Sequence, residues 1–134
     1  MSEYVTDTHA LLWHIVQNRR LSGKAASVFR EVDEGEGQIY IPTIVLIEIV
    51  YLMKKIRIPQ ESIDNVMGLL DAPATNYRLA QITPATVHAL QSLPRQLIPD
   101  MPDRIITATA LELDVPLITI DRKITGAGVV EVIW

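Results

Sequence analysis

The stretch YVTDTHALLW, residues 4–13, joins a short β-branched and aromatic run to a helical pattern, with Asp7 at the junction. A second run of this kind, PLITID at residues 116–121, also ends on an acid, Asp121. Strands favour β-branched residues, and an aspartate that follows a strand often caps the next helix. The two stretches therefore predict buried strands whose carboxyl ends each carry an aspartate.

Short strand patterns alternate with longer helical patterns along the rest of the chain. Strands are predicted near residues 3–7, 38–41, 78–82, 116–120 and 129–133, and helices near 8–17, 22–34, 43–56, 60–71, 84–92 and 103–114. Ser22, Thr43 and Thr83 are predicted to cap the second, third and fifth of these helices. Strand–helix–strand order implies right-handed crossovers and a mostly parallel sheet with helices on both faces. We therefore expect one α/β domain over residues 1–134.

Composition narrows the class of protein. The 134 residues are 49% hydrophobic, include no cysteine and carry a formal net charge of -4. No apolar stretch approaches the roughly 20 residues of a bilayer span, and the N-terminus lacks a signal-peptide pattern, so no membrane and a cytoplasmic location are expected. The net negative charge argues against a protein that binds nucleic acid through a broad basic surface. It leaves room for an enzyme whose acids recruit cations.

Four carboxylates, those of Asp7, Glu48, Asp103 and Asp121, stand against or inside strongly apolar runs. Glu48 lies within the apolar helical segment 44–53, where an unpaired charge costs several kcal/mol. If the four acids converge, their like charges repel and need a cation. All-oxygen ligands favour Mg²⁺ or Mn²⁺ over zinc. The residues therefore predict a metal-binding acidic cluster.

Each acid also has a purely structural interpretation, which stays open at this point. Asp7 and Asp121 could be helix N-caps, and Asp103 could be a first-turn acid favoured by the helix dipole. Glu48 could form a buried ion pair with Arg104, or could be protonated in an apolar pocket.

Four segments together resemble the PIN-domain ribonucleases, specifically the toxin component of VapBC-type toxin–antitoxin pairs. They are residues 4–13, 44–49, 102–110 and 117–121, and each contains one of the four acids. The resemblance covers essentially the full chain. It implies a three-layer α/β/α sandwich with a mostly parallel central sheet, metal-dependent RNA cleavage, and inhibition by a cognate antitoxin. Relatives in this subgroup often carry a histidine where this chain has Ile98-Pro99.

The expected chemistry assigns a role to each acid. Asp7 and Asp103 are expected to hold one Mg²⁺ or Mn²⁺, with Glu48 contacting it directly or through water, and the ion lowers the pKa of a bound water. Asp121 is expected to hold a second, weaker metal or to position water. Thr119 shares a strand face with Asp121, so its hydroxyl either donates to the acids or is exposed at an edge.

Substrate and partner contacts are expected outside the acids. Arg104 is expected to contact a phosphate or to pair with a neighbouring carboxylate, and Arg122 and Lys123 are predicted to contact RNA or to form solvated surface. The helices 43–56 and 60–71 carry more apolar residues than one sheet covers. In proteins that this chain resembles, these helices form a groove for an antitoxin segment, and two toxin chains form a homodimer.

Two other functions remain open from the residues. A Mg²⁺-dependent phosphoryl-transfer domain also places acids at strand ends, although Asp7-Thr8-His9 lacks the second acid of such first motifs. A non-catalytic PIN-like protein or RNA interaction domain would use the acids only as caps and in ion pairs. Trp13 and Trp134 are expected to pack in the core rather than to stack on bases.

Overall fold

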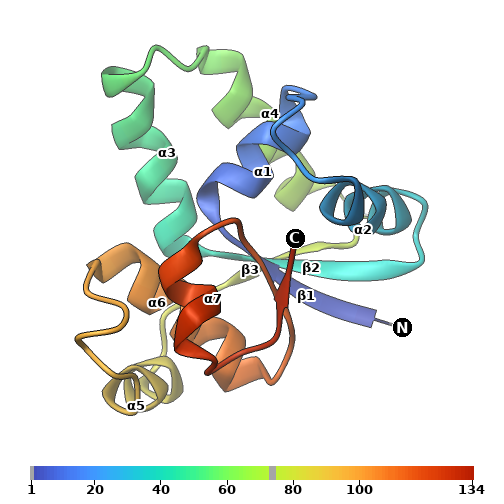
Figure 1. The fold of residues 1–134 in the computed structure, drawn as a ribbon. Coiled ribbons are helices and arrows are strands. Elements are labelled where there is room, and N and C mark those ends of the chain that lie inside the picture. Colours follow the sequence, from blue (N-terminus) through green and yellow to red (C-terminus); the bar gives the residue numbers. More distant parts are fainter. Residues whose placement is uncertain (1, 73–74) are drawn as a thin grey trace.

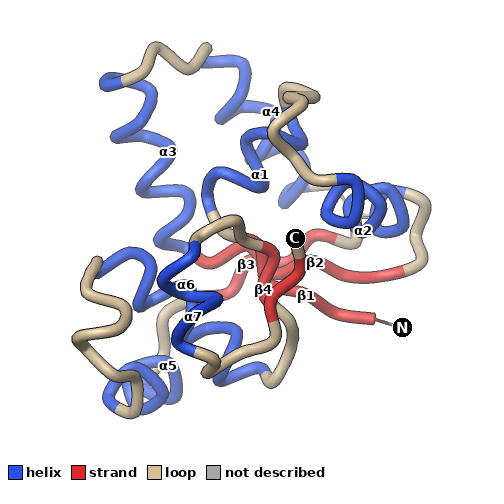
Figure 2. Tube along the Cα trace, in the orientation of Figure 1, coloured by secondary structure: helices blue, strands red, loops and turns tan. Residues whose placement is uncertain are grey.

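A five-stranded sheet lies at the centre of the computed structural model, which describes residues 2–72 and 75–134 (Figures 1 and 2). The strand order is β3-β2-β1-β4-β5, and all four pairings are parallel. The strands are β1 Ser2–Thr6, β2 Gly37–Pro42, β3 Tyr77–Ala80, β4 Leu117–Ile118 and β5 Val132–Ile133. The predicted parallel sheet is therefore confirmed.

Helices cover both faces of this sheet. They are α1 Thr8–Ile15, α2 Gly23–Asp33, α3 Thr43–Lys55, α4 Gln60–Asp71, α5 Pro84–Gln91, α6 Met101–Leu113 and α7 Arg122–Ala127. Figure 1 shows α1, α2 and α4 on one side of the sheet, and α5, α6 and α7 on the other. The helix α3 rises away from the carboxyl end of β2. This arrangement is the predicted three-layer α/β/α sandwich.

Capping chemistry determines where several helices begin. Ser22 and Thr83 cap α2 and α5 as predicted, and each accepts a backbone N–H from three residues further on. The predicted cap at Thr43 is wrong, because Pro42 occupies the cap position and Thr43 is the first residue of α3. The Thr43 hydroxyl instead donates to the carbonyl of Ala80 at 3.3 Å, which ties the start of α3 to β3.

The carboxyl-terminal part of the chain departs most from the prediction. The strands predicted over 116–120 and 129–133 are only two residues long each, and α7 was not predicted at all. Asp121 starts α7 by accepting two backbone N–H groups of its first turn. Gly128, with φ 66°, ends it in the left-handed region that glycine adopts without strain. So short a helix, with Gly126 inside it, leaves little periodic pattern to detect.

The core fills the space between the sheet and both helical layers. β1, β2 and β4 contribute side chains that are buried, as expected for parallel strands covered on both faces. The largest fully buried side chains include Val5, Leu11, Phe29, Ile39, Ile41, Ile49, Ile106, Leu117, Ile118 and Ile124. Over the described ranges, no helix has the length and apolar character needed to cross a membrane.

Candidate acidic metal centre

The register of β1 and β4 brings two of the four predicted acids to one edge of the sheet. Thr6 is paired with Ile118, and the backbone N–H of Asp7 donates to the Ile118 carbonyl at 3.1 Å. Asp121 follows Ile118 by three residues at the carboxyl end of the neighbouring strand. Ligands of open parallel sheets bind outside this end of the strands.

The Asp7 carboxylate is buried and is held at both oxygens. Its Oδ1 accepts the backbone N–H of Ala10 at 2.9 Å, and its Oδ2 accepts the hydroxyl of Thr119 at 2.5 Å. Burial raises the pKa of Asp7 above its usual value, although both hydrogen bonds oppose the change. Asp7 is thus the N-cap of α1 through Oδ1, while Oδ2 contacts Thr119 on the side of the acidic cluster.

Thr119 joins the two strand-end acids. Its side chain is fully buried, so the alternative of an exposed edge residue is wrong. Its hydroxyl donates to Asp7, and its oxygen accepts the backbone N–H of Asp121 at 3.0 Å. The same residue therefore fixes the carboxylate of one acid and the backbone of the other.

Glu48 approaches the cluster from α3. Its carboxylate is part-buried, and Oε1 accepts the hydroxyl of Thr8 at 2.6 Å. The sequence patterns did not predict this contact of Thr8 with the acidic cluster. The signal available was a threonine directly after Asp7, but its partner lies 40 positions away in the chain.

Asp103, in the first turn of α6, shows most directly that the acids are neighbours. Burial first, and then the negative charges of Asp121, Asp100, Glu48 and Asp7, raise the pKa of Asp103 to about 7. No hydrogen bond from the described residues acts against this rise. The fold therefore brings all four predicted acids close enough to act on one another electrostatically.

The donor set suits a hard divalent cation. In the hydrogen bonds between described residues, Asp121 uses Oδ1 alone and Glu48 uses Oε1 alone, so each keeps a second oxygen available. Within residues 2–72 and 75–134, no three acidic or histidine side chains are positioned to coordinate one metal ion together. Mg²⁺ usually keeps several waters and is held by one or two carboxylates. The residues therefore fit an ion bound by one or two of the acids, with the others acting through water.

Arg104 does not form the ion pair that was predicted for it. Its guanidinium donates to the carbonyl oxygens of Ile98, Leu90 and Leu93 at 3.0, 3.3 and 3.2 Å. Because the guanidinium already donates to these three carbonyls, it anchors the segment that precedes α6 and does not pair with Glu48. The one ion pair found among the described residues joins His14 and Asp33.

Arg122 and Lys123 lie at the edge of the acidic cluster. They are the first two residues of α7 and follow Asp121 directly, and both are exposed. Their side chains are therefore accessible to a polyanion that approaches the acids.

An apolar groove adjoins the cluster on the α3 side. A cavity of about 580 Å³ lies between α3 and the start of α6, and its lining includes Ile47, Glu48, Tyr51, Met101 and Pro102. Tyr51 is 73% exposed and Met101 is 63% exposed, which is unusual for large apolar side chains. The groove therefore runs from an exposed apolar surface to one of the four acids.

Comparison with known proteins agrees with this geometry. Residues 4–129 match the family model described as the PIN domain. The chain belongs to the PIN domain family. This PIN domain is 31% identical to Ribonuclease VapC22 of Mycobacterium tuberculosis over 124 residues. The aligned region covers 92% of this chain and 91% of that protein. The resemblance inferred from the four acid-bearing segments is confirmed.

Solved structures share the fold of this PIN domain. The crystal structure of VapBC2 from Rickettsia felis bound to a promoter DNA fragment superimposes with a TM-score of 0.71 at 15% identity, covering 97% of this chain and 96% of that one. A toxin–antitoxin complex from Klebsiella pneumoniae has a TM-score of 0.65 at 20% identity, covering 95% and 94%. At such identities the likeness concerns the three-layer architecture.

Proposed function

We propose that this PIN domain is a divalent-metal-dependent endoribonuclease and the toxin of a toxin–antitoxin pair. The observation that carries the proposal is the convergence of Asp7, Glu48, Asp103 and Asp121. Burial of Asp103 and repulsion by the other acids raise the pKa of Asp103. The ribonuclease named among its relatives and the toxin–antitoxin complexes among its structural neighbours support the same reading.

The chain's own residues have defined tasks in such a reaction. A bound Mg²⁺ or Mn²⁺ would neutralise phosphate charge and lower the pKa of a water molecule. Asp7 and Asp103 would hold the ion, and Glu48 would contact it directly or through water. Asp121 would position water or a second, weaker ion. A phosphodiester is itself anionic, so the four acids without a cation would repel it.

Cleavage assays with acid variants test this proposal. Asp103→Asn and Asp7→Asn should abolish cleavage of total cellular RNA in Mg²⁺ or Mn²⁺, and EDTA should abolish it in the wild type. Asp64→Asn, at an exposed position on α4, is the matched control and should cleave normally. Absence of metal-dependent cleavage in antitoxin-free protein would favour the non-catalytic interaction domain instead.

Arg122 and Lys123 are proposed to contact the RNA backbone beside the acids. Neutralising both should weaken RNA binding and make its salt dependence shallower by about 1.4 in the log–log slope, because two phosphate contacts are lost. The exposed pair Arg57 and Arg95 provides a control of equal charge. A slope equal to that of the wild type would remove Arg122 and Lys123 from the RNA footprint.

The antitoxin is proposed to bind on the helices 43–56 and 60–71, and the groove between α3 and the start of α6 adjoins the first of these helices. The exposed side chains of Ile47, Val50 and Tyr51 support this position, since an apolar surface of this kind is costly to leave in water. Tyr51→Ala should weaken antitoxin binding at least about tenfold, in the range of interface hot spots, while cleavage without antitoxin is unchanged. Val16→Ala, at an exposed apolar residue after α1, is the control.

A homodimer is proposed through a separate apolar surface. Val87 on α5 and Leu97 after it are 48% and 49% exposed. The double variant Val87→Asp with Leu97→Asp should sediment as a monomer where the wild type sediments as a dimer. A wild-type monomer at all concentrations tested would contradict the proposal.

A further inference from the structure

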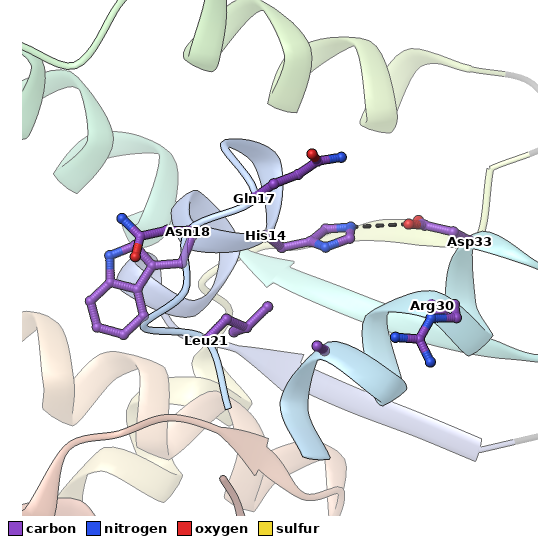
Figure 3. Close-up of a pocket in the computed structure, with 8 residues that line it drawn as sticks. His14, Gln17, Asn18, Leu21, Arg30 and Asp33 are labelled. Carbon is purple, nitrogen blue, oxygen red and sulfur yellow. Dashed lines mark hydrogen bonds and ion pairs between the residues drawn. The ribbon is translucent and has the colours of Figure 1, made fainter. Parts of the chain in front are cut away.

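A second cavity, of about 330 Å³, lies between the end of α1 and α2, away from the four acids (Figure 3). Trp13, His14 and Gln17 line it from α1 and the turn that follows, and Arg30 and Asp33 line it from α2. We propose that this cavity binds a guanine base of the RNA strand whose backbone is cleaved at the acidic cluster. The inference rests on the proposed ribonuclease function.

The acceptor in this cavity is held in place by other side chains. Asp33 Oδ2 lies 3.0 Å from His14 Nε2, the contact drawn as a dashed line in Figure 3, and Asp33 Oδ1 accepts the Tyr77 hydroxyl at 2.6 Å. The His14 ring is in turn stacked on Phe29, with ring centroids 4.4 Å apart. Each carboxylate oxygen has a further lone pair, so Asp33 can still accept from a ligand.

The donors in this cavity are available. Arg30 is exposed one helical turn before Asp33 on α2, and Figure 3 shows the two side chains on the same helix. Across the described residues, Arg30 makes no ion pair, and the side-chain amide of Gln17 makes no hydrogen bond, whereas its backbone N–H donates to the His14 carbonyl. A guanidinium and a carboxylate spaced by three residues therefore line one cavity. The guanidinium is free to donate to a ligand, and each Asp33 oxygen, already engaged by His14 or Tyr77, keeps one lone pair for it.

This pairing of donor and acceptor matches guanine among the four bases. Guanine presents the acceptors O6 and N7 to an arginine, which is the commonest base-specific contact, and presents N–H donors at N1 and N2 to a carboxylate. Uracil and cytosine have no N7, and adenine has an amino group in place of O6. Trp13, Leu21 and Ala26 supply apolar surface for the planar face of the base.

The cavity is also within reach of the acidic cluster along α1. His9 influences the charge of Asp7, and its ring lies 5.7 Å from that of Trp13 between centroids. The rise of an α-helix separates Asp7 and Trp13 by about 9 Å along the axis. Arg30 and Asp33 lie beyond Trp13, near the end of α2 and just before the amino end of β2. A strand whose scissile phosphate lies at the acids would therefore place in the cavity a base several nucleotides from the cleaved bond.

Binding of single nucleotides in EDTA tests the cavity independently of cleavage. By NMR, guanosine monophosphate should shift the side-chain signals of Gln17 and Arg30 and bind several-fold more tightly than the adenosine, cytidine and uridine monophosphates. Arg30→Met should weaken guanosine monophosphate binding about tenfold, as expected for loss of one bidentate base contact. Arg95→Met, at another exposed arginine, is the control and should bind as the wild type does.

Equal binding of all four nucleotides, shifts located elsewhere, or an Arg30→Met variant that binds normally would each overturn the inference. A second measurement compares cleavage of an RNA oligonucleotide with that of the same oligonucleotide carrying 7-deazaguanine for guanine. 7-Deazaguanine lacks the N7 acceptor assigned to Arg30, so its cleavage should be slower in the wild type, and Arg30→Met should cleave the two oligonucleotides equally. A wild type that binds guanosine monophosphate but cleaves no RNA would refute the ribonuclease proposal and leave the guanine site standing.

Discussion

The hydroxyl of Thr119 donates to Asp7 Oδ2 at 2.5 Å, across 112 residues of sequence. Both side chains are buried, and the same threonine oxygen accepts the backbone N–H of Asp121. A buried carboxylate is costly unless its oxygens are paired. This bond therefore offsets part of the cost of a charged Asp7 at the carboxyl end of β1, although burial still raises the pKa of Asp7.

Replacing Thr119 by valine keeps the shape of the side chain and removes this donor. We expect the free energy of unfolding to fall by about 1–3 kcal/mol, because a buried acceptor loses its partner. Cleavage should fall by about tenfold or more, as for other residues that orient metal ligands. Urea unfolding and RNA cleavage measure the two effects. Thr109→Val, which removes only a bond to the Ile105 carbonyl within α6, should leave cleavage unchanged.

Thr8 should matter through Glu48. The variant Thr8→Val deprives Glu48 Oε1 of its 2.6 Å hydrogen bond, so the carboxylate is no longer oriented. We expect Mg²⁺ or Mn²⁺ affinity, measured by calorimetry, and cleavage to fall about 10–100-fold, while Thr8→Ser retains both. Wild-type metal affinity in Thr8→Val would show that Glu48 is oriented by other contacts.

The raised pKa of Asp103 predicts how stability depends on pH in metal-free protein. Asp103 titrates near 3.8 when unfolded and at about 7 when folded, so between these values the folded state binds more protons. The folded state favours protonated Asp103, so the free energy of unfolding is higher at low pH and falls as pH rises towards 7. Asp103→Asn removes this loss.

Urea unfolding in EDTA between pH 4 and 7, the range set by the two pKa values of Asp103, checks this sign. The stability advantage of Asp103→Asn over the wild type should grow as pH rises. Added Mg²⁺ should reduce that advantage, since a cation stabilises the ionised acids. An advantage that is constant with pH would mean that burial and the neighbouring acids do not raise the pKa of Asp103.

Arg104 should contribute to stability rather than to RNA contact. Its guanidinium donates to three carbonyl oxygens, and Arg104→Met removes this donor from all three, although the Leu90 carbonyl still accepts the Leu93 N–H. We expect the free energy of unfolding to fall by about 2 kcal/mol or more. Arg95→Met, at an exposed arginine in the same region, should change stability little. Normal stability combined with weaker RNA binding would return Arg104 to the phosphate role first predicted for it.

Much of the fold and of the acidic cluster was predictable from short-range patterns. The helix Gln60–Asp71 has both of its predicted ends, and Ser22 and Thr83 cap the helices they were expected to cap. Helical periodicity and capping involve residues within about four positions of one another, so one segment carries all the information they need. Asp7 and Asp121 were placed at strand ends by the same local reasoning.

The sequence alone determined the alternation of strands and helices, the four acids, and the PIN-like order of the segments that bear them. The tertiary structure decided which donor meets which acid: Thr8 with Glu48, Thr119 with Asp7, and three carbonyls, rather than Glu48, with Arg104. It also decided the cavity of about 330 Å³ between α1 and α2. These contacts join residues that are distant in the chain, and only strand register and helix packing bring such residues together.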